Sequence, residues 1–285
     1  MRVRVAPDLT LSVEERGSGA PLVLLHGFTG SARSWDAVAD AWAERFRVLA
    51  VELIGHGRSD APANARRYGM ERAAGDLAAL LDALGIAGTH LVGYSLGGRV
   101  SLRFAIQHPD RVASLVLESA SAGIDDDAER AARRARDEVL ADRLERDGIE
   151  RFVELWEREP LFATQRALPA SVRAALRATR LAQRPHGLAN SLRGMGAGAA
   201  EPLWDRLARV RAPVLVVTGA LDLRYCEIAA RLAAALPRGR HAVVAGAGHA
   251  PHLEHPTILA RLGLEFLTSE DAAGEGEHMR VEVSR

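Results

Sequence analysis

The chain contains the stretch His90-Leu91-Val92-Gly93-Tyr94-Ser95-Leu96-Gly97, in which a short apolar run meets a helix-like segment from Leu96 to His108. Residues 93–97 form the pattern G-x-S-x-G at the junction of a predicted strand and a predicted helix. In this context a sharp turn lifts the serine hydroxyl clear of the sheet, and the helix N-terminus offers free N–H groups. The pattern therefore predicts that Ser95 lies at the centre of a catalytic site.

Short apolar runs alternate with amphipathic segments on both sides of this turn. Residues 2–5 and 9–15 predict an antiparallel hairpin. Further strands are predicted at 22–25, 47–51, 90–92, 112–117, 214–218 and 241–244, and helices at 35–45, 70–84, 96–108, 228–236 and 257–267. This alternation is typical of an α/β fold in which helices cover both faces of a mostly parallel sheet, here of eight strands.

The alternation stops between residues 121 and 211, where the composition favours helices and no β-branched run occurs. We interpret this segment as a helical cap, or lid, inserted into a core formed by residues 1–120 and 212–268. The polar tail, residues 269–285, is expected to be poorly ordered, although 279–283 could form a short strand.

The composition narrows the possible functions. The 285 residues include 37 basic and 37 acidic side chains, so the net charge gives no sign of a nucleic-acid or membrane partner. Every basic residue is arginine, which excludes lysine Schiff-base chemistry. Cys226 is the only cysteine, so an intramolecular disulfide and a thiolate metal cluster are excluded. We expect no metal and no cofactor.

The chain lacks a long apolar signal segment at its N-terminus and any run of the roughly 18 apolar residues that a membrane span needs. We therefore expect a soluble, unprocessed protein of the cytoplasm. We expect it to act on a small molecule, and a monomer is favoured over an oligomer.

A serine hydroxyl needs an imidazole to take its proton, and the imidazole needs a carboxylate to fix its tautomer. Asp222 and His249 each follow a predicted strand, in the order serine, acid, histidine that this type of turn predicts. Asp222 could instead be a helix N-cap. His252 and His255 are alternatives to His249, but they lie near the last helix and are more plausible as surface or capping groups.

Two backbone N–H groups are expected to form an oxyanion hole. One belongs to Leu96, directly after the serine, and the other to Phe28 in the loop His26-Gly27-Phe28-Thr29-Gly30. His26 could be mistaken for a catalytic histidine. We expect it to be structural, with its ring bonded to the loop backbone.

Together these features resemble the α/β-hydrolase superfamily, over nearly the whole chain from Leu9 to Leu267. The matching landmarks are His26-Gly27, Gly55-His56-Gly57-Arg58-Ser59, the turn at Ser95, Asp222 and His249. The resemblance implies the fold and the triad. It does not by itself imply one reaction, because one fold and one triad serve many chemistries.

Four longer stretches narrow the choice: Gly-Tyr-Ser-Leu-Gly-Gly-Arg at 93–99, Leu-Glu-Ser-Ala at 117–120, Trp-Glu-Arg-Glu-Pro-Leu-Phe at 156–162, and Gly-Leu-Ala-Asn-Ser-Leu-Arg-Gly-Met-Gly at 187–196. They resemble the 2-succinyl-6-hydroxy-2,4-cyclohexadiene-1-carboxylate synthases of menaquinone biosynthesis. The resemblance implies a lyase that eliminates pyruvate from 2-succinyl-5-enolpyruvyl-6-hydroxy-3-cyclohexene-1-carboxylate, with Ser95 as a base. It also implies a set of substrate-binding residues: Tyr94, Arg99, Arg133, Trp156 and Arg180.

Arg99 has a physical case of its own, because the first turn of the helix after Ser95 can aim its guanidinium at a carboxylate beside the serine. The alternative is an exposed arginine with an ion-pair partner. For Arg133 and Arg180 this alternative is stronger, since the insertion is dense in arginine.

The chain departs from that family at Glu52 and Ile54, where relatives often have Asp and Pro, and at Glu157, where some have Tyr. Glu157 would repel an anionic substrate, so we expect it to face solvent. The main alternative function is a carboxylic ester hydrolase with Ser95 as nucleophile. A catalytically silent binding protein is disfavoured because all three triad residues are in register.

Overall fold

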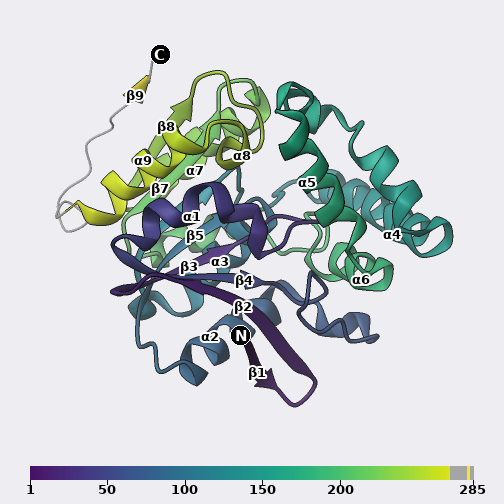
Figure 1. Ribbon diagram of the computed structural model, residues 1–285, viewed down its shortest axis with the longest axis horizontal. Helices are drawn as coiled ribbons and strands as arrows, with labels where there is room; N and C mark the ends of the chain where they lie inside the picture. Colours follow the sequence, from purple (N-terminus) through teal and green to yellow (C-terminus); the bar gives the residue numbers. More distant parts are fainter. Residues whose placement is uncertain (270–280, 283–285) are drawn as a thin grey trace.

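The computed structural model describes residues 1–269 and 281–282, and its centre is one twisted sheet (Figure 1). The strands are β1 (Arg2–Ala6), β2 (Leu9–Arg16), β3 (Ala20–Leu25), β4 (Phe46–Glu52), β5 (Thr89–Tyr94), β6 (Val112–Glu118), β7 (Val214–Gly219), β8 (Gly239–Val244) and β9 (Val281–Glu282). They lie in the order β1-β2-β4-β3-β5-β6-β7-β8-β9. The β1–β2 and β2–β4 pairs are antiparallel, and the others are parallel.

The eight predicted strands are all present, each within two residues of its predicted bounds, and the two-residue β9 falls inside the predicted segment 279–283. Most of the tail that we expected to be poorly ordered lies outside the described residues. The mostly parallel α/β sheet is therefore confirmed.

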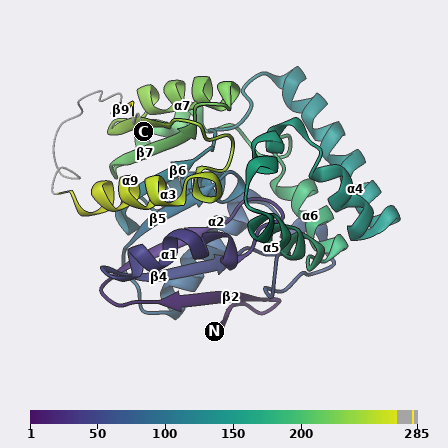
Figure 2. The same ribbon diagram turned by 45° about the horizontal axis from the view of Figure 1, so that its top comes forward.

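Helices cover both faces of the sheet (Figures 1 and 2). On one face lie α1 (Asp36–Ala43), α8 (Pro251–Glu254) and α9 (Pro256–Thr268), and on the other α2 (Met70–Ala83), α3 (Leu96–Gln107) and α7 (Leu223–Ala235). Short 3-10 turns occur at η1 (Ala32–Trp35), η2 (Ala65–Arg67) and η3 (Pro109–Arg111). No helix within the described residues is long and apolar enough to cross a membrane.

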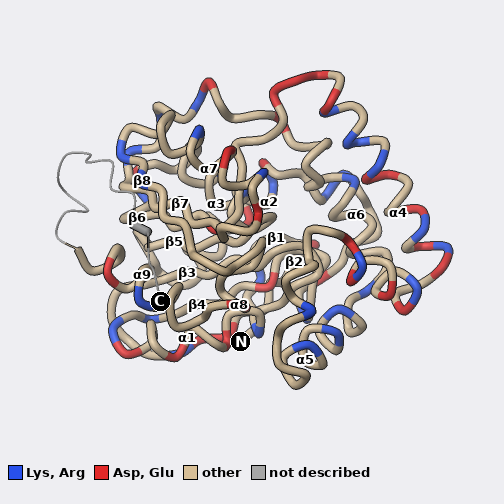
Figure 3. The backbone as a smooth tube through the Cα atoms, turned by 90° about the horizontal axis from the view of Figure 1, so that it is seen from above, with Lys and Arg blue, Asp and Glu red and all other residues tan. Residues whose placement is uncertain are grey.

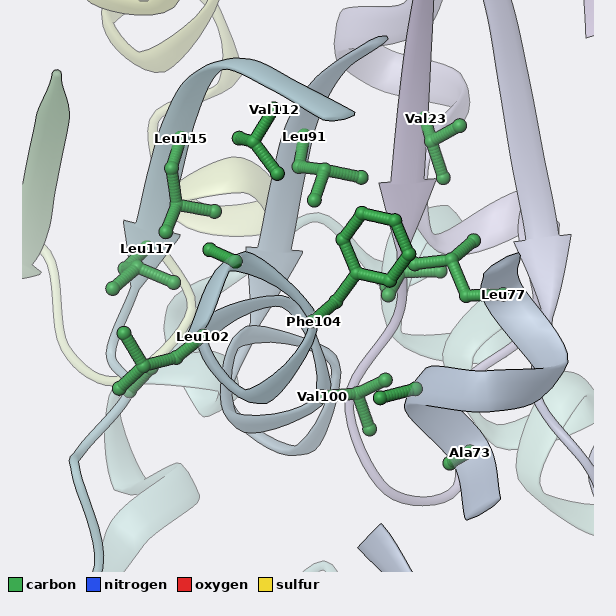
Figure 4. Packing of buried hydrophobic residues seen from close by; sticks show 14 of the residues in the cluster. Val23, Ala73, Leu77, Leu91, Val100, Leu102, Phe104, Val112, Leu115 and Leu117 are labelled. Atoms are coloured by element: carbon green, nitrogen blue, oxygen red, sulfur yellow. The ribbon is translucent and has the colours of Figure 1, made fainter. Parts of the chain in front are cut away.

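The alternation of side chains along each strand explains why both faces need a cover. In β3, Leu22 and Leu24 belong to the cluster under α1 and α9, whereas Val23 and Leu25 belong to the cluster under α2 and α3. Figure 4 shows the second cluster, where Phe104 of α3 packs between the strands and α2. A strand that is buried on both faces must be apolar throughout, which is the pattern seen in the sequence.

Between β6 and β7 the chain forms helices and no strand. These are α4 (Asp127–Trp156), η4 (Pro160–Ala167), α5 (Ala170–Leu181), α6 (Pro185–Met195) and η5 (Trp204–Arg209). We call α4, η4, α5 and α6 the cap helices. They gather on the side of the molecule away from α9 (Figures 1 and 2) and have an apolar cluster of their own, which includes Leu144, Phe152 and Leu188. By contrast, Leu207 of η5 belongs to the cluster under α2 and α3.

Candidate active site

Ser95 stands at the tight turn between β5 and α3. Its backbone has φ 49° and ψ −105°, a sparsely populated conformation for a residue with a side chain. A Cβ on Gly93 would lie 2.6 Å from the carbonyl oxygen of Gly97, so only glycine fits there. The Ser95 N–H donates to the carbonyl of Glu118 at 2.8 Å, which ties the turn to β6. The predicted strand–turn–helix geometry is therefore present.

The side chains of the predicted triad meet at one edge of the sheet, beyond the carboxyl ends of their strands. His249 Nδ1 lies 2.7 Å from Asp222 Oδ2, and His249 Nε2 lies 3.3 Å from Ser95 Oγ. An ionised Asp222 can only accept, so Nδ1 carries the proton and Nε2 is free to accept one from the serine. Asp222 also N-caps α7, because its Oδ1 accepts from the Tyr225 N–H at 3.3 Å. Both interpretations of Asp222 are thus compatible with its position.

The loop that carries His249 is held by a carboxylate. Glu254 accepts hydrogen bonds from the N–H groups of Gly248, at 2.6 Å, and Ala250, at 3.3 Å, on either side of the histidine. The Tyr225 ring packs edge-on against the imidazole at a centroid distance of 4.5 Å. The position of His249 is therefore fixed from its backbone and from its ring.

The other histidines near the site have different partners. His252 is buried between Trp35 and Tyr94, and its Nδ1 lies 2.8 Å from Glu118 Oε1. The His26 ring bonds the Gly27 carbonyl at 2.7 Å and accepts from the Leu53 N–H at 3.1 Å, and burial lowers its pKa. These two bonds to loop backbone are the contacts expected of a structural histidine. His255 lies at the N-cap of α9.

A cavity of about 110 Å³ opens beside the triad, between the core and the cap helices. The core contributes Phe28, Tyr94, Ser95, Leu96, Arg99, Tyr225 and His249, and the segment between β6 and β7 contributes Arg133, Asp137, Leu140, Trp156, Leu161, Phe162, Ser191, Leu192, Met195, Gly196 and Ala197. We call it the catalytic cavity. Among the residues predicted to contact the substrate, Arg180 alone is outside its lining.

Arg99 is a half-buried cation of the catalytic cavity. Its Nη1 is inaccessible to solvent and has no hydrogen-bond partner within the described residues. Burial lowers the pKa of Arg99 to about 10, so the guanidinium stays charged at neutral pH. A buried donor atom of a charged group is costly to leave without a partner, and a ligand with an acceptor oxygen would remove that cost. The alternative of an exposed, ion-paired arginine is therefore wrong.

Two further lining residues carry a buried polar atom without a partner among the described residues: Trp156 Nε1 and Ser191 Oγ. Arg133, by contrast, is paired, since its Nε lies 2.9 Å from Asp137 Oδ1. Sequence reasoning missed Ser191, Asp137 and Tyr225. The spacing of four residues between Arg133 and Asp137 on one helix was the available signal for that pair.

Glu157 does not line the catalytic cavity and keeps 25% of its side chain exposed, but it is bonded to two arginines and is not free in solvent as predicted. Its carboxylate pairs with Arg177 at 2.5 Å and with Arg180 at 3.3 Å. The second contact of Arg180 is Gln165 Oε1, at 2.9 Å. Because Arg180 on α5 is buried, a nearby anion is needed to compensate its charge, and Glu157 supplies it.

The described residues contain no group of three or more His, Cys, Asp and Glu side chains placed to hold a metal. What the cavity offers instead is a hydroxyl with its base, and hydrogen-bond donors around it. This set suits proton transfer or acyl transfer on a small anionic molecule.

The family model of the alpha/beta hydrolase fold matches residues 20–256. A Bacillus subtilis protein, provisionally named a 2-succinyl-6-hydroxy-2,4-cyclohexadiene-1-carboxylate synthase, is 40% identical over 94% of this chain and 98% of its own length. The synthase of that name from an Enterobacter species is 34% identical over 84% of this chain and 88% of its own.

Two solved structures extend the comparison. MenH from S. aureus superposes with a TM-score of 0.86 at 32% identity, over 90% of this chain and 97% of its own. A malate-bound thermophilic esterase from Thermogutta terrifontis has a TM-score of 0.82 at 30% identity, over 94% and 98% of the two chains. The chain belongs to the α/β-hydrolase family and, within it, to the branch that contains the 2-succinyl-6-hydroxy-2,4-cyclohexadiene-1-carboxylate synthases.

Proposed function

We propose that this enzyme is a carbon–oxygen lyase that eliminates pyruvate from 2-succinyl-5-enolpyruvyl-6-hydroxy-3-cyclohexene-1-carboxylate to give 2-succinyl-6-hydroxy-2,4-cyclohexadiene-1-carboxylate. The identity to synthases of that name over nearly the full chain supports the reaction. The observation that carries the proposal in the structure is Arg99, a half-buried guanidinium in the same cavity as Ser95, whose buried Nη1 has no partner among the described residues. A polycarboxylate substrate would supply that partner.

In the proposed mechanism Ser95 is a base. Asp222 holds His249 with Nε2 toward Ser95 Oγ, and His249 takes the hydroxyl proton while the serine oxygen removes a proton from the substrate ring. The electron pair of the broken C–H bond forms one ring double bond, the existing ring double bond shifts by one position, and the C–O bond from the ring to the enolpyruvyl group breaks. Pyruvate leaves as its enolate, which regains a proton from the His249 imidazolium. The 3.3 Å contact between Ser95 and His249 can shorten when substrate binds.

The remaining site assignments belong to the same proposal. The backbone N–H groups of Phe28 and Leu96, two residues of the cavity lining, would stabilise the enolate-like charge. Arg99 and Arg133 would hold carboxylates, next to Tyr94 and Trp156. Residues 121–211 would act as the lid over the core of residues 1–120 and 212–268, in a cytoplasmic enzyme that needs no cofactor.

A carboxylic ester hydrolase remains the second candidate, favoured by the esterase from Thermogutta terrifontis among the similar structures. In that reaction Ser95 would be a nucleophile and form an acyl-enzyme. It predicts a burst of alcohol from a chromogenic ester and a covalent adduct on Ser95, whereas the lyase forms no adduct.

The test supplies the enolpyruvyl precursor and follows pyruvate release by wild type, Ser95→Ala and Arg99→Ala. We expect rapid release by wild type and a loss of roughly a thousandfold or more in Ser95→Ala. Arg99→Ala should raise KM about tenfold or more, since hydrogen bonds to a charged group contribute about 1.5–3 kcal/mol. Brisk cleavage of short-chain esters without pyruvate release would reject the lyase.

A further inference from the structure

A second cavity, of about 330 Å³, lies in the cap between η4 and α5. We call it the cap cavity. Its polar lining consists of Glu157, Gln165, Arg166, Arg173, Arg177 and Arg180, and its apolar lining of Phe162, Ala170, Ala174 and Leu176. This volume lies within the usual range of small-ligand sites, roughly 300–1,000 Å³, whereas the catalytic cavity of about 110 Å³ falls below it.

The charge of the cap cavity is strongly positive although the chain as a whole is neutral. Four arginines face one carboxylate, Glu157, whose two oxygens are already bonded to Arg177 and Arg180. Arg173 donates to the carbonyl of Arg166, so neither of these two gains an anionic partner from that bond. Figure 3 shows the arginines as blue segments along α5. Clustered cations around a concave surface concentrate anions there.

Phe162 is the only residue that lines both cavities within the described part of the chain. On one side its ring lies 5.5 Å from the guanidinium carbon of Arg180, and on the other it lies 5.2 Å from the Trp156 ring and 6.4 Å from that of His249. Its backbone, with φ −108° and ψ 15°, interrupts η4. One aromatic ring thus separates the arginine cluster from the triad.

We propose that the cap cavity is a second binding site, which captures organic polycarboxylates before they pass Phe162 to Ser95. The identity of the natural ligand of the cap cavity rests on the lyase reaction given under the proposed function. The catalytic cavity, of about 110 Å³, is the smaller of the two, and Phe162 lies between them. Arg166, Arg173 and Arg177 would bind the anion in the cap cavity. The Phe162 ring would separate the bound anion from the catalytic cavity.

The test titrates citrate, a tricarboxylate probe, into the enzyme by calorimetry. Arg173→Ala/Arg177→Ala removes two cations of the cap cavity. Arg211→Ala/Arg261→Ala removes two exposed, ion-paired arginines elsewhere and is the matched control for net charge. Arg99→Ala removes the cation of the catalytic cavity. Thermal unfolding of each variant checks that it is folded.

We expect citrate to bind wild type, the control and Arg99→Ala with similar affinity, and Arg173→Ala/Arg177→Ala roughly tenfold more weakly. Binding that is lost only in Arg99→Ala would place citrate in the catalytic cavity and overturn the proposal. If Arg211→Ala/Arg261→Ala weakened citrate binding equally, the effect would come from net charge alone, and the proposal would be overturned as well. If inorganic phosphate binds as tightly as citrate with the same dependence on Arg173 and Arg177, the site is not selective for carboxylates and the assignment fails.

A kinetic experiment separates this proposal from the proposed function. With the enolpyruvyl precursor, Arg173→Ala/Arg177→Ala should raise KM for pyruvate release roughly tenfold and leave kcat unchanged, because the chemistry takes place beyond Phe162. A wild type that binds citrate in the cap cavity but releases no pyruvate would reject the lyase and keep the anion site. Pyruvate release with an unchanged KM in the variant would reject capture in the cap cavity and keep the lyase.

Discussion

The catalytic cavity is lined by three residues with buried donor atoms that have no partner in the described structure, namely Arg99, Trp156 and Ser191. Leaving such an atom unpaired costs about 1–3 kcal/mol, and more for a charged group. A ligand with several acceptor oxygens would recover this free energy. The three atoms therefore indicate a ligand with several acceptor oxygens, whereas the predicted triad is compatible with many substrates.

The variant Ser191→Ala tests whether the unpaired hydroxyl of Ser191 binds the substrate. Because the hydroxyl has no partner among the described residues, we expect the thermal unfolding midpoint to stay the same or rise slightly. If the substrate pairs with it, KM for pyruvate release should rise about three- to tenfold, in line with about 0.5–1.5 kcal/mol for one hydrogen bond. A lower midpoint with an unchanged KM would show that the hydroxyl serves the fold instead.

At the scale of the element, the turn between β5 and α3 depends on close backbone contact. Gly93→Ala would place a methyl group 2.6 Å from the Gly97 carbonyl oxygen, and the backbone around it cannot retreat without opening the turn. We expect the free energy of unfolding to fall by about 2 kcal/mol or more, together with a loss of activity.

Gly75→Ala is the control for Gly93→Ala, since a Cβ on Gly75 in α2 would meet nothing within 4 Å. It should raise stability by about 0.5–1 kcal/mol through helix propensity alone. Urea unfolding measures both variants. Equal effects on stability would contradict the close contact inferred for Gly93.

The loop that carries His249 is held by hydrogen bonds to the Glu254 carboxylate, and this role of Glu254 can be tested. In Glu254→Ala the N–H groups of Gly248 and Ala250 lose their common acceptor, so the imidazole should lose its fixed position. We expect kcat to fall about tenfold or more with KM nearly unchanged, because misplacement of a catalytic group affects the chemical step.

Glu254→Gln keeps one acceptor oxygen and should recover part of the rate. Glu265→Ala on the exposed side of α9 is the matched control and should behave as wild type. If Glu254→Ala changed KM alone, the carboxylate would act on binding and not on the position of His249.

At the scale of the whole molecule, two buried histidines make stability depend on pH. Burial lowers the pKa of His56 from 6.5 to about 3 and also lowers that of His26. As the pH falls below about 6.5, the unfolded chain binds protons at these rings while the folded chain does not. The free energy of unfolding should therefore decrease by up to about 1.4 kcal/mol per pH unit for each ring.

The measurement is urea unfolding at pH 7 and pH 5, for wild type and His56→Gln. We expect a smaller loss of stability on acidification in the variant, although its stability at pH 7 will be lower because the site is buried. The exposed His186→Gln is the control. An identical pH dependence in wild type and His56→Gln would show that His56 does not contribute in this window.

The fold and the order of the triad could be predicted because they depend on local patterns. A strand buried on both faces must be an apolar run, and Ser95, Asp222 and His249 lie on the loops or turns that follow such runs at one edge of the sheet. Element bounds were then off by only a residue or two in most cases, although α7 begins at Leu223, earlier than predicted, because Asp222 caps it.

The charge pairs of the cap could not be predicted in the same way. Whether an arginine is solvated, paired or aimed at a ligand depends on which helices pack together, and sequence spacing indicates a pair only within one helix, as for Arg133 and Asp137. Glu157 therefore reached Arg177 and Arg180 across the cap, while Arg133 found Asp137 on its own helix. That Arg99 Nη1 has no partner could be recognised only from the positions of all its described neighbours.

The unpaired donors of the catalytic cavity have a consequence for the life of the protein in a cell. An empty site that leaves them uncompensated makes the ligand-free form the less stable one, and a bound ligand shifts the folding equilibrium by mass action. Chains that unfold are removed by proteases, so the abundance of this enzyme should rise with the supply of its substrate, without any change in gene expression.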